Sequence, residues 1–254
     1  MAHASHTRRG NGGATWKAGP DVAPEHDAAA EATGKAYASF TGNPAVILEA
    51  QELLQHKDEL DPLSVRELKQ ALLNAGEGPM TNPTLTNNRI AAETKQASLL
   101  NSFQFKFKGK PITANQIDDL LNTSNDLAER KAVWEASKES GPALKNNLIR
   151  LQSLRNGVAG EVNYPSYFDL ETAAYGMTAA EMVQMNEQFM RDLRPLYLQL
   201  HTWAKYKLAE KFHQPVPDQI PAHWLNNRWA QTWPGLVDAA NTAPDFKSKT
   251  TGGT

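Results

Sequence analysis

The sequence predicts an all-α protein built from many helices. Apolar side chains recur three and four residues apart over most of the chain, which is the period of a helix with one buried face. Residue types that cap helix N-termini precede several of these periodic segments. Only the segment around Phe105 alternates with the period of two that is typical of a strand.

Length and composition exclude several classes of protein. With 254 residues, the chain can bury a sizeable core in one large domain or two small ones. A net charge of -2 gives no electrostatic indication of nucleic-acid binding. The absence of cysteine excludes disulfides and thiolate ligands. No run approaches the roughly 20 apolar residues of a transmembrane segment, and no signal peptide is visible.

We expect three regions along the chain. Residues 1–36 are rich in Gly, Ala, His and Pro without a hydrophobic period, so they are expected to be a disordered or non-homologous tail. Residues 37–245 are the expected helical region. Residues 246–254 have a composition like that of the first tail and are also expected to be disordered.

The first elements of the helical region have recognisable boundaries. Asp61 followed by Pro62 predicts an N-cap and a first turn, and the apolar period then runs to an end at Gly76. The segment TLTNNRIAAETKQASLLNSF, residues 84–103, continues as a second helix. The segment FQFKFKGKPI alternates up to a turn at Gly109, which predicts a short strand or an extended loop.

Two capping boxes begin later helices. Thr113 with Gln116 and Thr178 with Glu181 have the spacing in which the two side chains bond reciprocally to backbone N–H groups. A further helix is expected from Pro142. The helix after Thr178 is expected to continue to about Lys211, with a kink at Pro195.

No catalytic constellation is recognisable from the residues alone. None of the seven histidines is followed by Glu-x-x-His, and nucleophile elbows and phosphate-binding glycine loops are absent. The charge run DLAERKAVWEASKES is interpreted as a solvated helix face. Tyr164, Tyr167, Phe168 and Tyr175 form a cluster for which core packing and ligand contact are both open interpretations.

The stretch IPAHWLNNRWAQTWPGL contains three of the chain's six tryptophans. On a helix beginning near Pro221, His223, Asn227 and either Gln231 or Thr232 would recur at roughly helical spacing. Amide side chains both donate and accept hydrogen bonds, so they suit a peptide backbone or a terminal carboxylate. The alternative is that they bond to neighbouring loop backbone.

The stretch IPAHWLNNRWAQTW resembles the angiotensin-converting enzyme family of zinc peptidyl-dipeptidases, whose members carry a closely similar run. The preceding segment LRPLYLQLHTWAKYKLAEKF is similar to the family's helix before that run. Weaker similarity covers roughly residues 49–238. This range corresponds to an N-terminal part of the family's catalytic domain.

The resemblance implies a helical domain divided by a groove, in which zinc activates water and dipeptides are released from a peptide's C-terminus. Gln231 matches the glutamine that helps to bind the substrate's free C-terminal carboxylate, and Thr232 lies beside it in that subsite. The same resemblance implies that Lys138 and Tyr175 are candidate chloride-site residues. Family members are usually secreted, periplasmic or membrane-associated.

The His-Glu-x-x-His helix and the distal glutamate of the family are absent from the sequence, so no catalytic or metal-ligating residue is expected in this chain. The first hypothesis is therefore an N-terminal part of a zinc peptidyl-dipeptidase that is inactive alone and needs the C-terminal half to complete the groove. The alternative is a non-catalytic helical module that binds peptide ends around Gln231.

Overall fold

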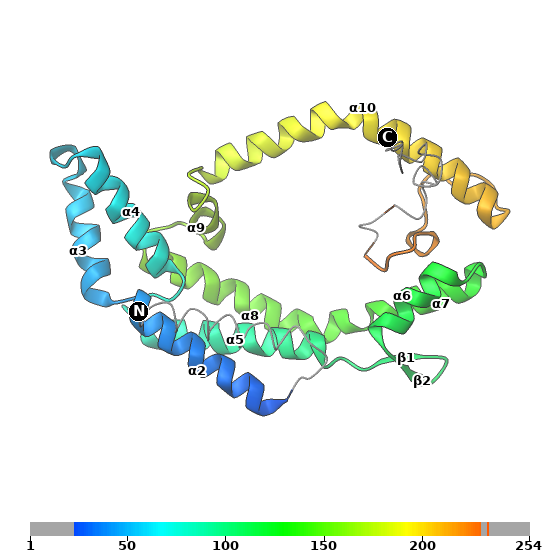
Figure 1. Ribbon diagram of the computed structural model, residues 1–254, viewed down its shortest axis with the longest axis horizontal. Helices are drawn as coiled ribbons and strands as arrows, with labels where there is room; N and C mark the ends of the chain where they lie inside the picture. The colour runs from blue at the N-terminus through cyan, green and yellow to red at the C-terminus, as the bar shows by residue number, and fades with distance from the viewer. Residues whose placement is uncertain (1–22, 230–232, 234–254) are drawn as a thin grey trace, which may run out of the picture. The chain divides into compact units, whose positions relative to one another are not determined.

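The computed structural model describes residues 23–229 and residue 233. These residues are helical almost throughout, with a two-stranded sheet, which confirms the all-α prediction (Figure 1). In chain order the elements are α2 (Pro24–Thr41), α3 (Pro44–Gln55), the 3-10 helix η1 (Lys57–Glu59), α4 (Pro62–Gly76), α5 (Pro83–Asn101), β1 (Phe105–Phe107), β2 (Lys110–Ile112), α6 (Ala114–Thr123), α7 (Leu127–Lys138), α8 (Ser140–Glu161), α9 (Tyr167–Ala173), α10 (Ala179–Phe212) and the 3-10 helix η2 (Ala222–Trp224).

The described residues divide into two compact units. Unit 1 contains the residues up to Phe103 together with Gly141–Gln188, and therefore α2 to α5, nearly all of α8, α9 and the first turns of α10. Unit 2 contains Gln104–Ser140 and the residues from Phe189 onward, and therefore the two strands, α6, α7, the longer part of α10 and η2.

Three helices of unit 1 begin with the same pair of residue types. Asn43, Asp61 and Asn82 are the N-caps of α3, α4 and α5, and each accepts a hydrogen bond from a backbone N–H of the first turn. Proline follows each of them at the first helical position, where no intrahelical N–H is needed. The predicted helix from Pro62 to Gly76 is confirmed at both ends.

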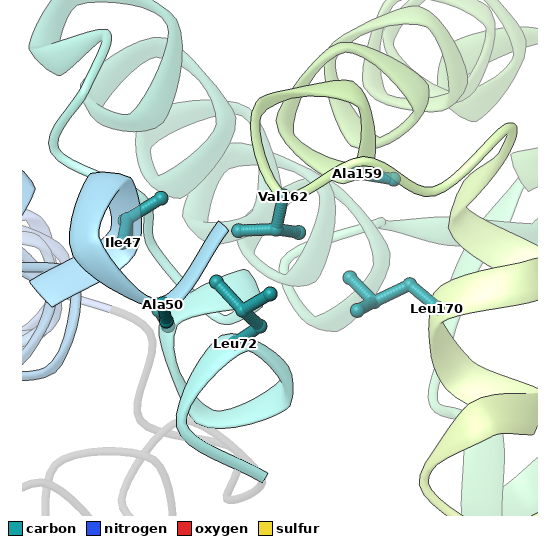
Figure 2. Close-up of a cluster of buried hydrophobic side chains, with 7 residues drawn as sticks. Ile47, Ala50, Leu72, Ala159, Val162 and Leu170 are labelled. Atoms are coloured by element: carbon teal, nitrogen blue, oxygen red, sulfur yellow. The ribbon is translucent and has the colours of Figure 1, made fainter. Parts of the chain in front are cut away.

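The core of unit 1 forms where α3 and α4 meet the end of α8 and the start of α9. Seven buried side chains make this cluster: Ile47, Ala50, Leu72, Ala75, Ala159, Val162 and Leu170. Figure 2 shows six of them converging from these elements. Tyr164 and Tyr167 pack against the cluster, whereas Phe168 and Tyr175 are exposed, so the tyrosine-rich segment is only partly core.

Helix α2 corrects the expectation of a disordered tail over residues 24–36, because it begins at Pro24. The rest of that expected tail, residues 1–22, and the expected tail at residues 246–254 lie outside the described residues. Ala23, the N-cap of α2, makes no side-chain cap, so the usual start signal is missing. Alanine nevertheless has the highest helix propensity, and α2 contacts α5. A Cβ built on Gly34 would lie 3.0 Å from Ile90 Cγ2, so glycine permits this close approach.

The alternating phenylalanine segment of unit 2 contains the first strand of an antiparallel hairpin; of the two predicted alternatives, a short strand or an extended loop, the structure shows the strand. Phe105 pairs with Ile112 and Phe107 with Lys110. Lys108 and Gly109 between the strands both have positive φ, at 51° and 75°. Such a pair is typical of the tight turns whose twist matches that of the flanking strands. Phe105 is buried, whereas Lys106 on the opposite side is exposed.

Both predicted capping boxes are confirmed. Thr113 Oγ1 accepts from the backbone N–H of Gln116, while the Gln116 side chain accepts from that of Thr113. Thr178 and Glu181 make the same reciprocal pair at the start of α10. Helix α10 continues through Pro195 without interruption. The kink expected at this residue stays a prediction.

Candidate functional site

The segment that carries the resemblance is not an α-helix over its described part. Residues 222–224 form η2, and the residues from Leu225 to Trp229 follow as bends and turns. The expectation of a helix from Pro221 that aligns His223 with Asn227 is therefore wrong. In this segment the Asn227 side chain accepts a hydrogen bond from the backbone N–H of Trp229 at 2.7 Å, as in a turn.

This conformation is held by Arg130 on α7, whose side chain is fully buried. Its Nε donates to the carbonyl oxygen of His223 at 2.8 Å, and its Nη2 donates to those of Trp224 at 3.1 Å and Leu225 at 3.0 Å. In an α-helix those carbonyls would accept from amides four residues later. The guanidinium supplies these carbonyls with donors, and the chain leaves η2 in an extended conformation at Leu225.

The same guanidinium closes the end of α6. Its Nη1 donates to the carbonyl oxygens of Leu121 and Ser124, which lie in the last turn and at the C-cap of that helix. These carbonyls have no intrahelical partner and form the negative end of the helix dipole. Arg130 makes no ion pair with a carboxylate among the described residues, so these backbone dipoles compensate its charge. The ring of Phe212 lies 5.1 Å from its guanidinium carbon.

A second cation, Lys138 at the end of α7, holds the same segment further along. Its ammonium donates to the carbonyl oxygen of Arg228 and lies 4.9 Å from the ring centre of Trp134 and 4.6 Å from that of Trp229. Desolvation and, to a lesser extent, the nearby Arg228 charge lower the pKa of Lys138. The indole N–H of Trp134 is buried and has no acceptor within the described part of the chain.

Arg228 links the segment to α6. Its Nε lies 3.2 Å from Asp118 Oδ1, an ion pair whose angles fall short of a hydrogen bond. The Arg228 side chain is 17% exposed, so this pair is less screened than one on the open surface. The carboxylate of Asp118 on α6 therefore fixes Arg228.

The residues predicted to bind substrate, Gln231 and Thr232, lie outside the described residues, and their roles stay predictions. The two candidate chloride-site residues lie in different units. Lys138 belongs to unit 2 and bonds to Arg228, whereas Tyr175 belongs to unit 1 and is 75% exposed. Tyr175 lines a groove of about 990 Å³ whose other walls come mainly from α3 and α4.

No group of three His, Asp or Glu side chains that could hold a metal occurs among residues 23–229 and Trp233. The described residues therefore do not fit a zinc ion. His201 instead makes ring contacts with Tyr197 and Trp233, at 5.6 and 6.0 Å between centroids. Within the described helices, none is both long and apolar enough to cross a membrane.

Arg130 was missed in the sequence because it lies in a charge run interpreted as solvated. The signal that could have revealed it is its spacing. Arg130 stands three residues from Leu127 and from Val133, at a position where the helical period places an apolar side chain. Val133 is fully buried and Leu127 packs against the core of unit 2, so Arg130 faces the interior with them.

His223 predicts a pH dependence for unit 2. Desolvation first, then Lys131 and Arg130, lower its pKa below the ordinary value of 6.5. The unfolded chain then binds a proton at a higher pH than the folded chain, so the free energy of unfolding should fall as the pH drops below about 6.5. Urea unfolding at pH 7.5 and 5.5 should show a smaller difference for His223→Gln than for the wild type.

The control for this measurement is His56→Gln, which removes an exposed histidine of unit 1. It should leave the difference between the two pH values as in the wild type. An equal pH dependence in His223→Gln and the wild type would contradict the prediction.

The comparison with known proteins covers this site and the helices that support it. A family model described as angiotensin-converting enzyme matches residues 2–251. The angiotensin-converting enzyme of Theromyzon tessulatum is 26% identical over 229 residues, which cover 83% of this chain and 35% of that protein. That of Sus scrofa is 32% identical over 126 residues, covering 48% of this chain and 10% of that protein. That of Mesocricetus auratus is 30% identical over 132 residues, covering 50% and 10%.

The chain belongs to the angiotensin-converting enzyme family. The match extends beyond residues 49–238, on which the resemblance rested. In the alignments with these three relatives, the chain spans 35%, 10% and 10% of the relative's length.

Proposed function

We propose that this chain forms the N-terminal part of a zinc peptidyl-dipeptidase domain and is inactive without the remainder. Its contribution is the side of the groove that binds the free C-terminal carboxylate of a peptide, through Gln231 and Thr232. Family membership supports a peptidase, and the run around Trp229 supports the assignment of this subsite. Chloride is a proposed activator, with Lys138 and Tyr175 as the residues of this chain that would contact it.

The observation that carries the proposal is an exposed apolar face on α10. Phe189, Leu193, Leu196, Leu200 and Trp203 recur at spacings of four and three residues and are 38–65% exposed. We call these five residues the α10 apolar face. Met190, Tyr197, Leu198 and Tyr206 beside this face are exposed as well. A continuous apolar face of this kind on a helix is normally buried against another part of a larger core.

The partner that this face fits is the rest of the peptidase domain. Helical packing partners interlock with apolar rows spaced by three and four residues. The alignment covers only 35% of the Theromyzon tessulatum protein. That relative therefore has further residues of the kind that could pack on the α10 apolar face. In this proposal the remainder also supplies the zinc ligands. Zinc, when bound, would activate water for attack on the peptide bond.

The test is complementation. The chain is assayed alone and mixed with the C-terminal part of a relative's catalytic domain, with zinc added, on a blocked tripeptide that has a free C-terminal carboxylate. Release of the C-terminal dipeptide is followed by chromatography. Activity is expected only in the mixture, at least about 100-fold above either part alone, because binding and chemistry then share one groove.

Gln231→Ala in the mixture should raise KM with little change in kcat, since a ground-state contact to the carboxylate is lost. The matched control is Gln199→Ala on α10, which removes an amide far from the motif in sequence. Activity of the chain alone would overturn the proposal. Inactivity of the mixture, with carboxylate-selective binding by the chain, would favour the non-catalytic binding module.

A further inference from the structure

A groove of about 990 Å³ lies wholly within unit 1. Its walls come from the end of α3, from most of α4, from the residues that follow α8 and from the loop between α9 and α10. Five of the side chains that line it belong to the core of unit 1 or pack against that core: Leu54, Leu72, Leu73, Val162 and Tyr164. A groove of this volume is in the size range of pockets that hold a ligand.

Amide side chains contribute much of the polar lining of this groove. They are Gln51, Gln55, Gln70 and Asn163. Within the described part of the chain, the side chains of Gln55 and Asn163 make no hydrogen bond. An amide both donates and accepts, so these two groups match the alternating N–H and C=O groups of a peptide backbone.

The charged lining of the groove is mainly positive. Arg66 and Lys69 on α4 are exposed, and neither makes an ion pair with a residue that the structure describes. Glu181 also lines the groove, but its carboxylate accepts from the backbone N–H of Thr178 at 2.8 Å and from its hydroxyl at 2.9 Å. The lining therefore presents two unpaired cations and a carboxylate that is already hydrogen-bonded.

The spacing of the two cations indicates the form of a matching ligand. Arg66 and Lys69 stand three positions apart on α4, so they share one side of the helix, with Cβ atoms about 5–6 Å apart. In an extended peptide, side chains two positions apart also share one side, at about 7 Å. A peptide with acids at alternate positions can therefore bring one carboxylate to each cation.

We propose that this groove binds an extended acidic peptide segment, with carboxylates at alternate positions against Arg66 and Lys69. Amide side chains of the lining bond to the peptide backbone, and the apolar side chains cover part of the intervening residues. Binding breaks no ion pair of the described chain, because neither cation has one. The site uses neither a free C-terminal carboxylate nor Gln231, so it goes beyond the proposed function.

The experiment uses a peptide without free ends. The probe is acetylated and C-terminally amidated Leu-Glu-Leu-Glu-Leu, and its comparison peptide has glutamine in place of both glutamates. Amidation removes the terminal carboxylate, so the subsite proposed at Gln231 does not contribute to binding. Both peptides are titrated into the ¹⁵N-labelled full chain in a low-salt buffer without chloride. Shifts of the amide signals of residues 51–55 and 173–178, which line the groove, locate the site and give Kd.

We expect the glutamate peptide to bind about 10-fold more tightly than the glutamine peptide, through two partly screened charge pairs. Added salt should reduce this preference. Arg66→Gln with Lys69→Gln should remove it and leave the Kd of the glutamine peptide within about twofold. The matched control is Lys145→Gln with Arg150→Gln on α8, two exposed cations of unit 1 outside the groove lining. This control changes the net charge equally and should keep the preference at about 10-fold.

Equal Kd values for the two peptides would overturn the proposal. Equal losses in the two double variants would show that net charge alone attracts the peptide, and signal changes confined to other residues would place it outside the groove. Glutarate that binds as tightly as the probe would exclude a peptide as the specific occupant. Loss of probe binding on addition of the C-terminal part would identify that part as the occupant instead. None of these results depends on dipeptide release, so failure here is distinguishable from failure of the proposed function.

Discussion

Arg130→Met is expected to lower the free energy of unfolding of unit 2 by about 3–5 kcal/mol. Methionine fills part of the volume but provides no N–H donor. The carbonyls of His223, Trp224 and Leu225 and the end of α6 would lose their charged donor together. Urea unfolding followed by tryptophan fluorescence measures the loss, since Trp224 lies in the core of unit 2.

Arg155→Met is the matched control for this substitution. Arg155 pairs with Glu93 at 3.0 Å, but its side chain is 40% exposed. Exposed pairs contribute about 0–1 kcal/mol, so the loss should be small. The explanation of the segment's conformation would be wrong if Arg130→Met cost no more than Arg155→Met. A large loss for Arg130→Met that is accompanied by retained protection of residues 223–228 would contradict it as well.

The second large effect is expected at the α10 apolar face. The double substitution Leu193→Gln with Leu196→Gln should weaken association with the complementing C-terminal part by about 3 kcal/mol, which is on the order of 100-fold in the association constant. The two side chains are 60% and 65% exposed, so most of their apolar surface is available to a partner. The association constant follows from activity measured against the concentration of the C-terminal part.

A matched pair of exposed leucines lies in unit 1, at Leu48 and Leu63, which are 59% and 62% exposed. Leu48→Gln with Leu63→Gln should leave the association constant within about twofold, because these side chains do not belong to a continuous apolar row. The double substitution on α10 should also reduce binding of a hydrophobic dye to the chain alone. Equal effects of the two pairs would show that the α10 apolar face has no special role in assembly.

Much of the fold could be predicted because the decisive interactions are local. An Asx residue before proline marks the start of α4, and the capping box at Thr113 marks that of α6. Alternation of phenylalanines up to a turn at Gly109 indicated a short strand or an extended loop, and the structure has a strand there. In each case the partners are within seven residues of one another, so the sequence order already brings them together.

Helix α2 was not predicted from the sequence, and the reason is physical. Its N-cap Ala23 has no side-chain acceptor. The alanine-rich composition of α2 is compatible with a disordered tail as well as with a helix. Packing against α5 decided between these two. That contact joins residues more than 40 positions apart, such as Gly34 and Ile90, and no periodicity within α2 indicates it.

The candidate site was predictable only in part. The run IPAHWLNNRWAQTW indicated the family, and the family match supports it. The backbone conformation of the run was predicted wrongly, because a helical spacing of His223 and Asn227 was taken to mean a helix. Helix formation depends on which donors the carbonyls receive, and here the donors come from Arg130, more than 90 residues earlier.

By itself, the sequence determined the helical class, the helix starts marked by caps, the extended segment around Phe105 and the family-specific run. These features depend on residues that are neighbours in the chain, whose geometry is the same in any protein. Only the tertiary structure decided that Arg130 is buried and not solvated, that Lys138 lies between Trp134 and Trp229, and that the segment from Leu225 to Trp229 is not a helix. The sequence does not show whether water or distant carbonyls solvate a charged side chain, because only packing selects between them.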